Sequence, residues 1–488
     1  MGVRNRRDQS KYGRIRKSSP SKEGVEIGNK ERNMVKTMAD RFVSMLAVAV
    51  CALVALADAT APVRTPTPFA AGERVTFYGD SITTHNYFTY QLEFILALRH
   101  PERPMLTISR GRAGGTAQGG FMRWDWDAAP VPSDRVVVMF GMNDVSRGLW
   151  KEANPDAALT ARREKALATY AEFQRKLTEK ILATGRKVLL VTPSPYDQYS
   201  PAEPPENLPF CNDPGLATCA KIVRDLAREK NLEVLDYHAA LTKFLKEHPE
   251  FGLLAKDRIH PDEKGGLLMA VIALEQAGDL AYSDETSFDA KGMDHAAFDY
   301  LPRHLPYPRQ TREYQAVNAV YPLDGRLSRE IVRITGLPAG RYRLAGDGKS
   351  IGVFTAEALA TGIDLACHET PSMAQAKSAA AAFNERRSHM QTSRRLVGIE
   401  FEIRAKGVDP ADRAAADAAI EKFRAGIERR LGGGKNPRLH GYYLGQADFY
   451  CSNRDKKAAF DAENERLYRQ LVQRCRPRGW KLSVEPTK

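Results

Sequence analysis

Two short, continuously apolar runs, residues 136–140 (VVVMF) and 188–191 (VLLV), restrict the fold of this chain more than any other feature. A strand with one face in water alternates apolar and polar residues, whereas a strand that is apolar throughout is buried on both faces. Helical patterns separate these runs from further strand-like segments. The expected strands cover residues 74–78, 105–109, 135–140, 187–192 and 232–236. Such alternation predicts a parallel sheet in a three-layer α/β domain, over residues 73–282.

Polar residues stand where these strands end, and ligands bind at that edge of a parallel sheet. The first strand runs directly into Gly79-Asp80-Ser81, where a helical pattern begins. The first N–H groups of a helix have no partner inside it and lie at the positive end of its dipole, so negative charge developing beside Ser81 would be stabilised. Taken alone, the tripeptide is more often a turn with an N-cap serine.

Three more polar segments follow in matching positions. The second strand leads into a glycine-rich loop, residues 109–116, which has neither G-x-G-x-x-G nor a Walker lysine and therefore does not indicate phosphate binding. The third strand is followed by Asn143, which could aim its amide at the same point or form an Asx turn. Asp257 and His260 precede a helical run, and we expect Pro261 in the first turn of that helix, which leaves His260 on the loop.

In this order and spacing the four segments resemble the SGNH hydrolases, also called GDSL esterases and lipases, over about residues 70–280. The resemblance implies a flavodoxin-like αβα domain and serine hydrolase chemistry. Ser81 would be the nucleophile, His260 the general base that later protonates the leaving alcohol, and Asp257 the carboxylate that positions the imidazole. The backbone N–H groups of Ser81 and Gly114 and the side chain of Asn143 would form the oxyanion hole.

Three positions adjoin these blocks or depart from the family pattern. The family commonly has Asp or Asn between the last glycine of its second block and the next threonine, where this chain has Gly115, so Gly111 is an alternative to Gly114 as the donor. Asp80 adjoins the serine but is expected to shape the loop, because the acid of the triad is assigned to the last block. His85 is a polar position of the first helical turn or a substrate contact, outside the expected triad.

The net charge of +13 would suit a nucleic-acid or membrane surface, but it is unevenly distributed. Residues 1–41 hold 12 Lys and Arg against 5 Asp and Glu, in a segment without an apolar period. A solvated tail therefore explains much of the charge, and nucleic acid is not expected as a partner.

Residues 42–57 form an uncharged apolar run that follows basic residues and precedes small-residue triplets. This pattern is typical of a secretory signal peptide, and the run is short for a spanning helix. We expect translation to begin at Met34 or Met38 and the mature protein to be secreted or periplasmic without a membrane span; an uncleaved membrane anchor is the alternative. The expected segments are a basic extension that is disordered or misassigned (1–33), a signal peptide (34–61) and a linker (62–72).

Signal cleavage would leave five cysteines, at positions 211, 219, 367, 451 and 475. Cys211 with Cys219 and Cys451 with Cys475 are possible disulfides in an oxidising compartment, and the pairing stays open. The sequence has no C-x-x-C pair and no His/Cys cluster with zinc spacing, so neither a metal nor a cofactor is expected.

The last two hundred residues are less informative. Residues 283–365 contain short strand-like runs and turn signals such as Gly346-Asp347-Gly348, which predict a small β-rich unit with hairpins. Residues 366–488 are expected to be a helical C-terminal region. Its helices are expected near 372–395, 411–430 and 458–475.

Together these features predict an exported serine esterase that removes an acetyl or other short acyl group from a carbohydrate. Within the family, the alternative is a lipid or lysophospholipid esterase, although no long apolar lid is evident near the site. Outside it, the alternative is a non-catalytic, glycan-binding envelope protein on a hydrolase scaffold, although all four blocks are intact.

Overall fold

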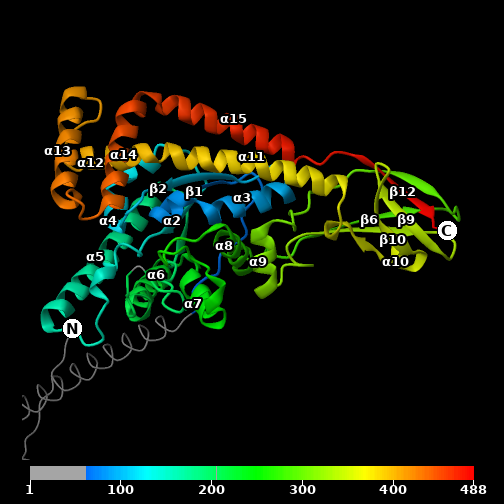
Figure 1. The fold of residues 1–488 in the computed structure, drawn as a ribbon, viewed down its shortest axis with the longest axis horizontal. Coiled ribbons are helices and arrows are strands. Elements are labelled where there is room, and N and C mark those ends of the chain that lie inside the picture. Colours follow the sequence, from blue (N-terminus) through cyan, green and yellow to red (C-terminus); the bar gives the residue numbers. More distant parts are fainter. Residues whose placement is uncertain (1–61, 205, 488) are drawn as a thin grey trace, which may run out of the picture. The chain divides into compact units, whose positions relative to one another are not determined.

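The computed structural model describes residues 62–204 and 206–487 (Figure 1). Its central element is a five-stranded parallel sheet in the order β2-β1-β3-β4-β5. The strands are β1 (Arg74–Gly79), β2 (Leu106–Gly111), β3 (Arg135–Met139), β4 (Lys187–Val191) and β5 (Glu233–Leu235). The parallel sheet expected from the apolar runs is confirmed. The expected extension and signal peptide lie outside the described residues.

Helices cover both faces of this sheet. They are α2 (Ser81–His85), α3 (Tyr87–Arg99), α4 (Ala117–Arg123), α5 (Ala157–Leu182), α6 (Ala217–Lys230), α7 (Tyr237–Glu247) and α8 (Glu263–Gln276). Helix α8 contacts α3 and α7 in one layer, whereas α5 contacts α4 and α6 in the other. The three-layer α/β fold predicted from the sequence is thereby confirmed.

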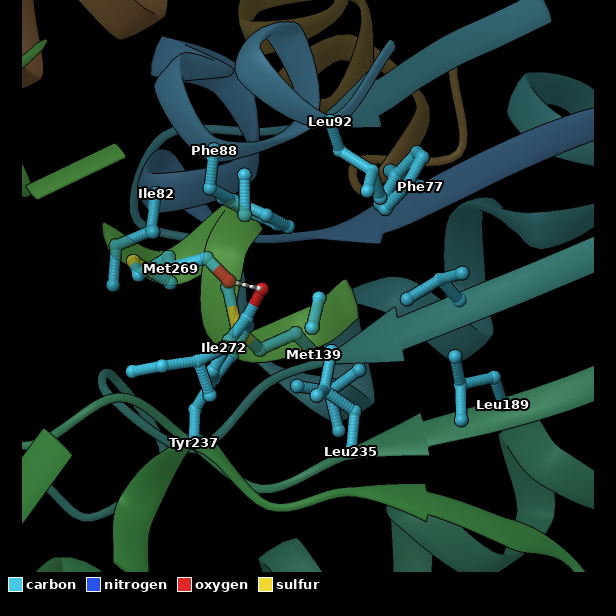
Figure 2. Close-up of a cluster of buried hydrophobic side chains, with 14 of the residues drawn as sticks. Phe77, Ile82, Phe88, Leu92, Met139, Leu189, Leu235, Tyr237, Met269 and Ile272 are labelled. Atoms are coloured by element: carbon cyan, nitrogen blue, oxygen red, sulfur yellow. Dashed lines mark hydrogen bonds between the residues drawn. The ribbon is translucent and has the colours of Figure 1, made fainter. Parts of the chain in front are cut away.

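The core between the sheet and the α3–α8 layer fixes the helices that flank the expected site (Figure 2). Side chains of the strands, α3, α7 and α8 meet there. The cluster includes Phe77, Phe88, Leu92, Met139, Leu189, Leu235, Met269 and Ile272. Full burial of one such side chain contributes roughly 1.5–3 kcal/mol. The Tyr237 hydroxyl also donates a hydrogen bond to the Met269 carbonyl oxygen at 3.0 Å.

The beginning of α8 approaches α3 closely enough to require glycine. A Cβ atom at Gly266 would lie 2.6 Å from the Cβ of Tyr87, and one at Gly265 would lie 2.3 Å from the carbonyl oxygen of Leu253. No side chain fits at such distances, so the two glycines let the helix start rest against its neighbours. The loop that carries His260 precedes this helix start and is held beside α2 in consequence.

A smaller β unit follows α8. It consists of a four-stranded sheet, β10-β9-β12-β7, and a three-stranded sheet, β11-β8-β6. The elements are β6 (Ser283–Asp289), β7 (Ala296–Tyr300), α9 (Arg312–Val320), β8 (Arg329–Thr335), β9 (Arg341–Gly346), β10 (Lys349–Thr355), α10 (Ala356–Thr361), β11 (Ile363–Asp364) and β12 (Trp480–Pro486). Asp347 and Gly348, both with positive φ, form the expected β9–β10 hairpin turn. Strand β12 comes from the C-terminal region, where only helices were expected, and lies between β9 and β7.

Glu330 in β8 is a carboxyl group buried inside this unit. Its Oε1 accepts hydrogen bonds from the hydroxyls of Tyr300 (2.8 Å) and Ser372 (3.3 Å), and its Oε2 has no hydrogen-bond partner within the described residues. Burial raises the pKa of Glu330 to about 8. A carboxyl whose folded pKa exceeds its unfolded value destabilises the fold increasingly as pH rises from about 4.5 toward 8.

We therefore expect Glu330→Gln, which mimics the protonated acid, to raise the unfolding midpoint at pH 8 and to leave it nearly unchanged at pH 4. Each unit of pKa shift corresponds to about 1.4 kcal/mol, so the gain at pH 8 is at most about 5 kcal/mol. Thermal unfolding followed by circular dichroism at both pH values measures it. A variant that is less stable at pH 8 than at pH 4, relative to the natural protein, would contradict the assignment.

The C-terminal helices pack on the α/β domain. They are α11 (Pro371–Ser393), α12 (Arg395–Arg404), α13 (Arg413–Leu431), α14 (Pro437–Asn453) and α15 (Lys457–Cys475). Helix α11 contacts both α15 and α3 and contributes to the core of the sheet (Figure 1). Two fully or almost fully buried ion pairs add to this contact, Arg386 with Glu93 and Arg394 with Asp127. The helices α12 and α14 were not expected from the sequence.

The described cysteines are all free, so neither possible disulfide is present in this part of the chain. Cys211, Cys219 and Cys475 are buried, where they serve as small apolar side chains. Among residues 62–204 and 206–487, no helix combines the length and apolar character needed to cross a membrane. The same residues contain no group of three or more His, Cys, Asp or Glu side chains suited to a metal ion.

Candidate active site

Ser81 is the first residue of α2 and directly follows the end of β1. Asp80 caps this helix, because its Oδ1 accepts a hydrogen bond from the Ile82 N–H at 2.9 Å. Asp80 is 1% exposed, and burial raises its pKa to about 6. A Cβ atom at Gly79 would lie 2.5 Å from the Met139 carbonyl oxygen, so this close strand-to-helix turn requires glycine. The carboxylate of Asp80 thus shapes the loop that presents Ser81.

The structure brings Ser81, His260 and Asp257 into one hydrogen-bonded row. The His260 Nε2 lies 2.7 Å from the Ser81 Oγ, and the His260 Nδ1 lies 2.6 Å from the Asp257 Oδ2. The Asp257 Oδ1 accepts from the N–H groups of Ile259 (3.0 Å) and His260 (3.1 Å). Burial alone would raise the pKa of Asp257, but the hydrogen bonds from His260 outweigh it and hold this pKa below its usual range. The carboxylate is therefore ionised and oriented toward the imidazole.

The loop between Asp257 and His260 is held by a residue that the sequence analysis did not identify. Arg258 has a φ of +61°, and its buried side chain donates to the carbonyl oxygens of Asp197 (2.7 Å) and Ser200 (3.1 Å). The Asp197 N–H donates in return to the Arg258 carbonyl oxygen at 3.1 Å. These bonds tie the histidine loop to the segment that follows β4. No local sequence signal distinguishes such an arginine from a solvated one.

The expectation for Pro261 was wrong. Helix α8 begins at Glu263, and Asp262 is its N-cap, with Oδ1 accepting from the Gly265 N–H at 2.9 Å. Pro261 therefore lies before the helix. Asp262 is the stronger start signal, because its side chain accepts a hydrogen bond from an N–H group of the first helical turn. Proline suits the first turn only because it lacks an N–H group there, and it satisfies no donor.

The side-chain amide of Asn143 is held in one orientation. Its Nδ2 donates to the Gly115 carbonyl oxygen at 2.9 Å, and its Oδ1 accepts from the Arg147 guanidinium at 3.1 Å. An amide nitrogen carries two hydrogens, so one of them stays available to a ligand. The neighbouring Asp144 accepts from the N–H groups of Ala117 (2.8 Å) and Gly141 (3.0 Å), and burial raises its pKa to about 7. These bonds join the third segment to the glycine loop.

Of the two glycines considered as donors, Gly111 and Gly114 differ in their surroundings. Gly111 ends β2 within the ladder beside Gly79, and a Cβ atom on it would lie 2.3 Å from the Thr84 nitrogen. Gly114 is exposed, with a φ of +69° and open space around it. Gly115 is buried, and a Cβ atom there would lie 2.9 Å from the Arg112 carbonyl oxygen, which explains why the larger residue common in the family does not fit unchanged in this loop.

The ring of half-buried His85 packs against that of His260. Its ring centroid is 4.5 Å from that of His260, with the planes inclined by 41°. Burial, and then the charge of His260, lower the pKa of His85 to about 4, while Asp257 opposes and Arg387 adds to this shift. His85 is therefore neutral at ordinary pH, and its ring limits the movement of the His260 ring. The sequence analysis left its role open.

We expect His85→Ala to lower kcat for a short-chain acetate roughly 10- to 100-fold with little change in KM, because small misplacements of a reacting group cost this much. His85→Phe keeps a ring against His260 and should recover most of the loss. Steady-state kinetics of the three proteins at a fixed pH measure both effects. An alanine variant with an unchanged kcat would show that the contact does not position His260.

Comparison with known proteins agrees with this geometry. Residues 77–266 match the model of the GDSL-like lipase/acylhydrolase family. An acetylxylan esterase of Geobacillus stearothermophilus is 25% identical over 225 residues, which cover 43% of this chain and 95% of the relative. The structure of a gut microbial diltiazem-metabolizing enzyme has a similar fold, with a TM-score of 0.71 and 23% identity over 87% of this chain and 100% of that one.

The likeness to that enzyme extends through the β unit and the C-terminal helices, since it spans most of this chain. The crystal structure of the Geobacillus stearothermophilus acetylxylan esterase aligns with 43% of this chain and 95% of its own, at 24% identity and a TM-score of 0.35. The matched family model, the acetylxylan esterase relative and the arrangement of the four segments identify residues 77–266 as a GDSL-like domain of the SGNH hydrolase superfamily, with the chemistry of a carboxylic ester hydrolase.

Proposed function

We propose that Ser81, His260 and Asp257 are the catalytic triad of this esterase and that it removes an acetyl or other short acyl group from a carbohydrate. The observation that carries the proposal is the unbroken row of hydrogen bonds from Asp257 through His260 to Ser81. A serine hydroxyl becomes a useful nucleophile when a neutral imidazole can take its proton, and the ionised carboxylate holds that imidazole in position.

In the proposed reaction, the Ser81 Oγ attacks the ester carbonyl carbon while the His260 Nε2 takes the hydroxyl proton. The tetrahedral intermediate places negative charge on the former carbonyl oxygen, which the N–H groups of Ser81 and Gly114 and the free Asn143 hydrogen would bind. As the C–O bond breaks, His260 gives its proton to the leaving alcohol. Water, activated by His260 in the same way, then releases the acid and restores Ser81.

We expect Asn143→Ala to lower kcat by a factor of ~10²–10³, because the loss of one oxyanion donor has this effect in serine hydrolases. KM should change much less, since the donor acts mainly on the charge that develops in the transition state. Steady-state hydrolysis of 4-nitrophenyl acetate measures both parameters. Gln118→Ala, which removes an exposed amide from the neighbouring helix α4, is the matched control and should keep the natural rate.

Two considerations support a carbohydrate as the alcohol. The relative from Geobacillus stearothermophilus carries the name acetylxylan esterase, and the expected export would bring the enzyme to extracellular glycans. Acetate release from acetylated xylo-oligosaccharides, compared with release of acyl groups from lysophospholipid, tests the choice. Faster hydrolysis of the lipid would refute the carbohydrate assignment while leaving the triad intact.

We further propose that the protein is exported through residues 34–61. N-terminal sequencing of the protein recovered outside the cytoplasm should give a start near residue 62. A start at Met1 or Gly2 would overturn this part of the proposal.

A further inference from the structure

Arg387, from the C-terminal helix α11, lies beside the two histidines of the site. Its guanidinium carbon is 4.5 Å from the centre of the Tyr87 ring and 5.5 Å from that of Tyr90. Tyr87 begins α3, two residues after His85, and the charge of Arg387 contributes to the lowered pKa of His85. Since the His85 ring contacts His260, the cation lies on the His260 side of the site.

Arg387 differs from its neighbours in having no polar partner. Arg386 is bound to Glu93 and to the Thr107 carbonyl oxygen, and Arg394 is bound to Asp127. Across residues 62–204 and 206–487, by contrast, no ion pair or hydrogen bond of Arg387 is found; its Nε is enclosed without a partner, as is that of Arg386. Partial burial of a guanidinium without an anion costs free energy of folding, and no internal salt bridge within the described residues compensates for it at Arg387.

The other cations near the site are already engaged. Arg112 is paired with Glu402 at 2.9 Å and stacks on Phe401 at 3.9 Å. Arg147 donates to the Met142 carbonyl oxygen (2.8 Å) and to Asn143. The N–H donors of Arg387 therefore remain available, and the planar guanidinium matches the two oxygens of a carboxylate.

We propose that Arg387 binds a carboxylate on the alcohol part of the substrate, so that the preferred esters are acylated carbohydrates that contain a uronic acid. This inference rests on the proposed function. Because His260 protonates the leaving alcohol, the sugar must lie on the His260 side, which is where Arg387 stands. The guanidinium lies over the ring of Tyr87, and this contact limits the rotamer freedom that binding would otherwise remove.

The test compares acetate release from an O-acetylated oligogalacturonide and from its methyl ester, which has the same acetyl groups without the charge. The natural protein should show a kcat/KM at least about tenfold higher for the acid. Arg387→Gln should bring the ratio close to one, and Arg387→Lys, which keeps the charge but not the fork, should give an intermediate ratio. Arg478→Gln, which changes an exposed arginine next to β12, should keep the natural ratio.

A natural ratio near one, or an undiminished ratio in both Arg387 variants, would overturn the inference. If Arg387→Gln fails to fold, Arg387→Lys decides, and an undiminished ratio in that variant overturns the inference. Hydrolysis of 4-nitrophenyl acetate distinguishes failure of the carboxylate site from failure of the proposed esterase function. Ser81-dependent hydrolysis without acid preference refutes the carboxylate site alone, whereas the absence of such hydrolysis refutes the proposed function and the inference with it.

Discussion

Replacement of Ser81 by alanine is expected to lower kcat for a short-chain chromogenic acetate by a factor on the order of 10⁶, as loss of the nucleophile does in other serine hydrolases. The reason is that the alanine side chain offers no oxygen to attack the carbonyl, and His260 then has no hydroxyl proton to take. The remaining donors can still bind the substrate and stabilise an oxyanion, so a small residual rate should persist. Steady-state kinetics with active protein at micromolar concentration cover this range.

The control is Ser452→Ala, which removes an exposed α14 hydroxyl that donates to the Asp448 carbonyl oxygen of the same helix. It should retain the natural rate. A serine-reactive phosphonate should label the natural protein at Ser81 and leave the Ser81→Ala protein unlabelled. Equal rates for the natural and Ser81→Ala proteins, or labelling at another residue, would refute the assignment of the nucleophile.

The largest effect on stability is expected for Asp127→Asn. Asp127 is buried and receives two hydrogen bonds from Arg394, both 2.7 Å long, and a further one from Arg123. The same arginines donate to the Gly79 carbonyl oxygen (2.9 Å) and the Gly111 carbonyl oxygen (3.0 Å), at the ends of β1 and β2. Removal of the charge leaves two buried guanidinium groups without an anion, which costs about 3–5 kcal/mol. Urea and thermal unfolding midpoints measure the loss.

The pH dependence provides a second check. Burial raises the pKa of Asp127, but Arg394 and then Arg123 lower it more, so the net pKa lies below its usual range. Stability from such a group is fully present above the unfolded pKa, near 3.9, and is lost as pH falls through the folded value. The difference in unfolding free energy between the natural protein and Asp127→Asn should therefore become smaller below about pH 4.

Glu229→Gln is the matched control, because Glu229 pairs with Arg175 at the surface, where both side chains are exposed. Surface pairs contribute about 0–1 kcal/mol. If Asp127→Asn shifted the midpoint no more than Glu229→Gln, the buried cluster would not stabilise the contact between α11 and the hydrolase domain.

Local features of the sequence predicted the sheet well. The runs 136–140 and 188–191 had to be buried strands, because they show no polar alternation. Helix α8 was also predicted, but it begins at Glu263, two residues later than expected, because Asp262 is its N-cap. A cap is decided by one side-chain hydrogen bond, and the sequence offered Pro261 as an equally regular candidate.

Several elements beyond residue 365 were not predicted from local sequence patterns. Strand β12 follows a helix, and its place between β9 and β7 depends on pairing with residues more than a hundred positions away. Helices α12 and α14 share a small core with α13, to which they contribute Leu396, Ile399, Ile403, Ala447 and Tyr450. Their existence is settled by packing rather than by local pattern.

By itself, the sequence determined the parallel sheet, the places where polar residues leave it, and the four segments of the family pattern, since strand period, glycine turns and helix starts are encoded by neighbouring residues. Only the tertiary structure decided which of those residues meet. It joined Ser81 to His260 across 179 positions, laid His85 against His260, and brought Arg387 to the same side of the site. The physical reason is that an apolar helix face fits many partners, so the match is made by packing of the whole chain and not by any single segment.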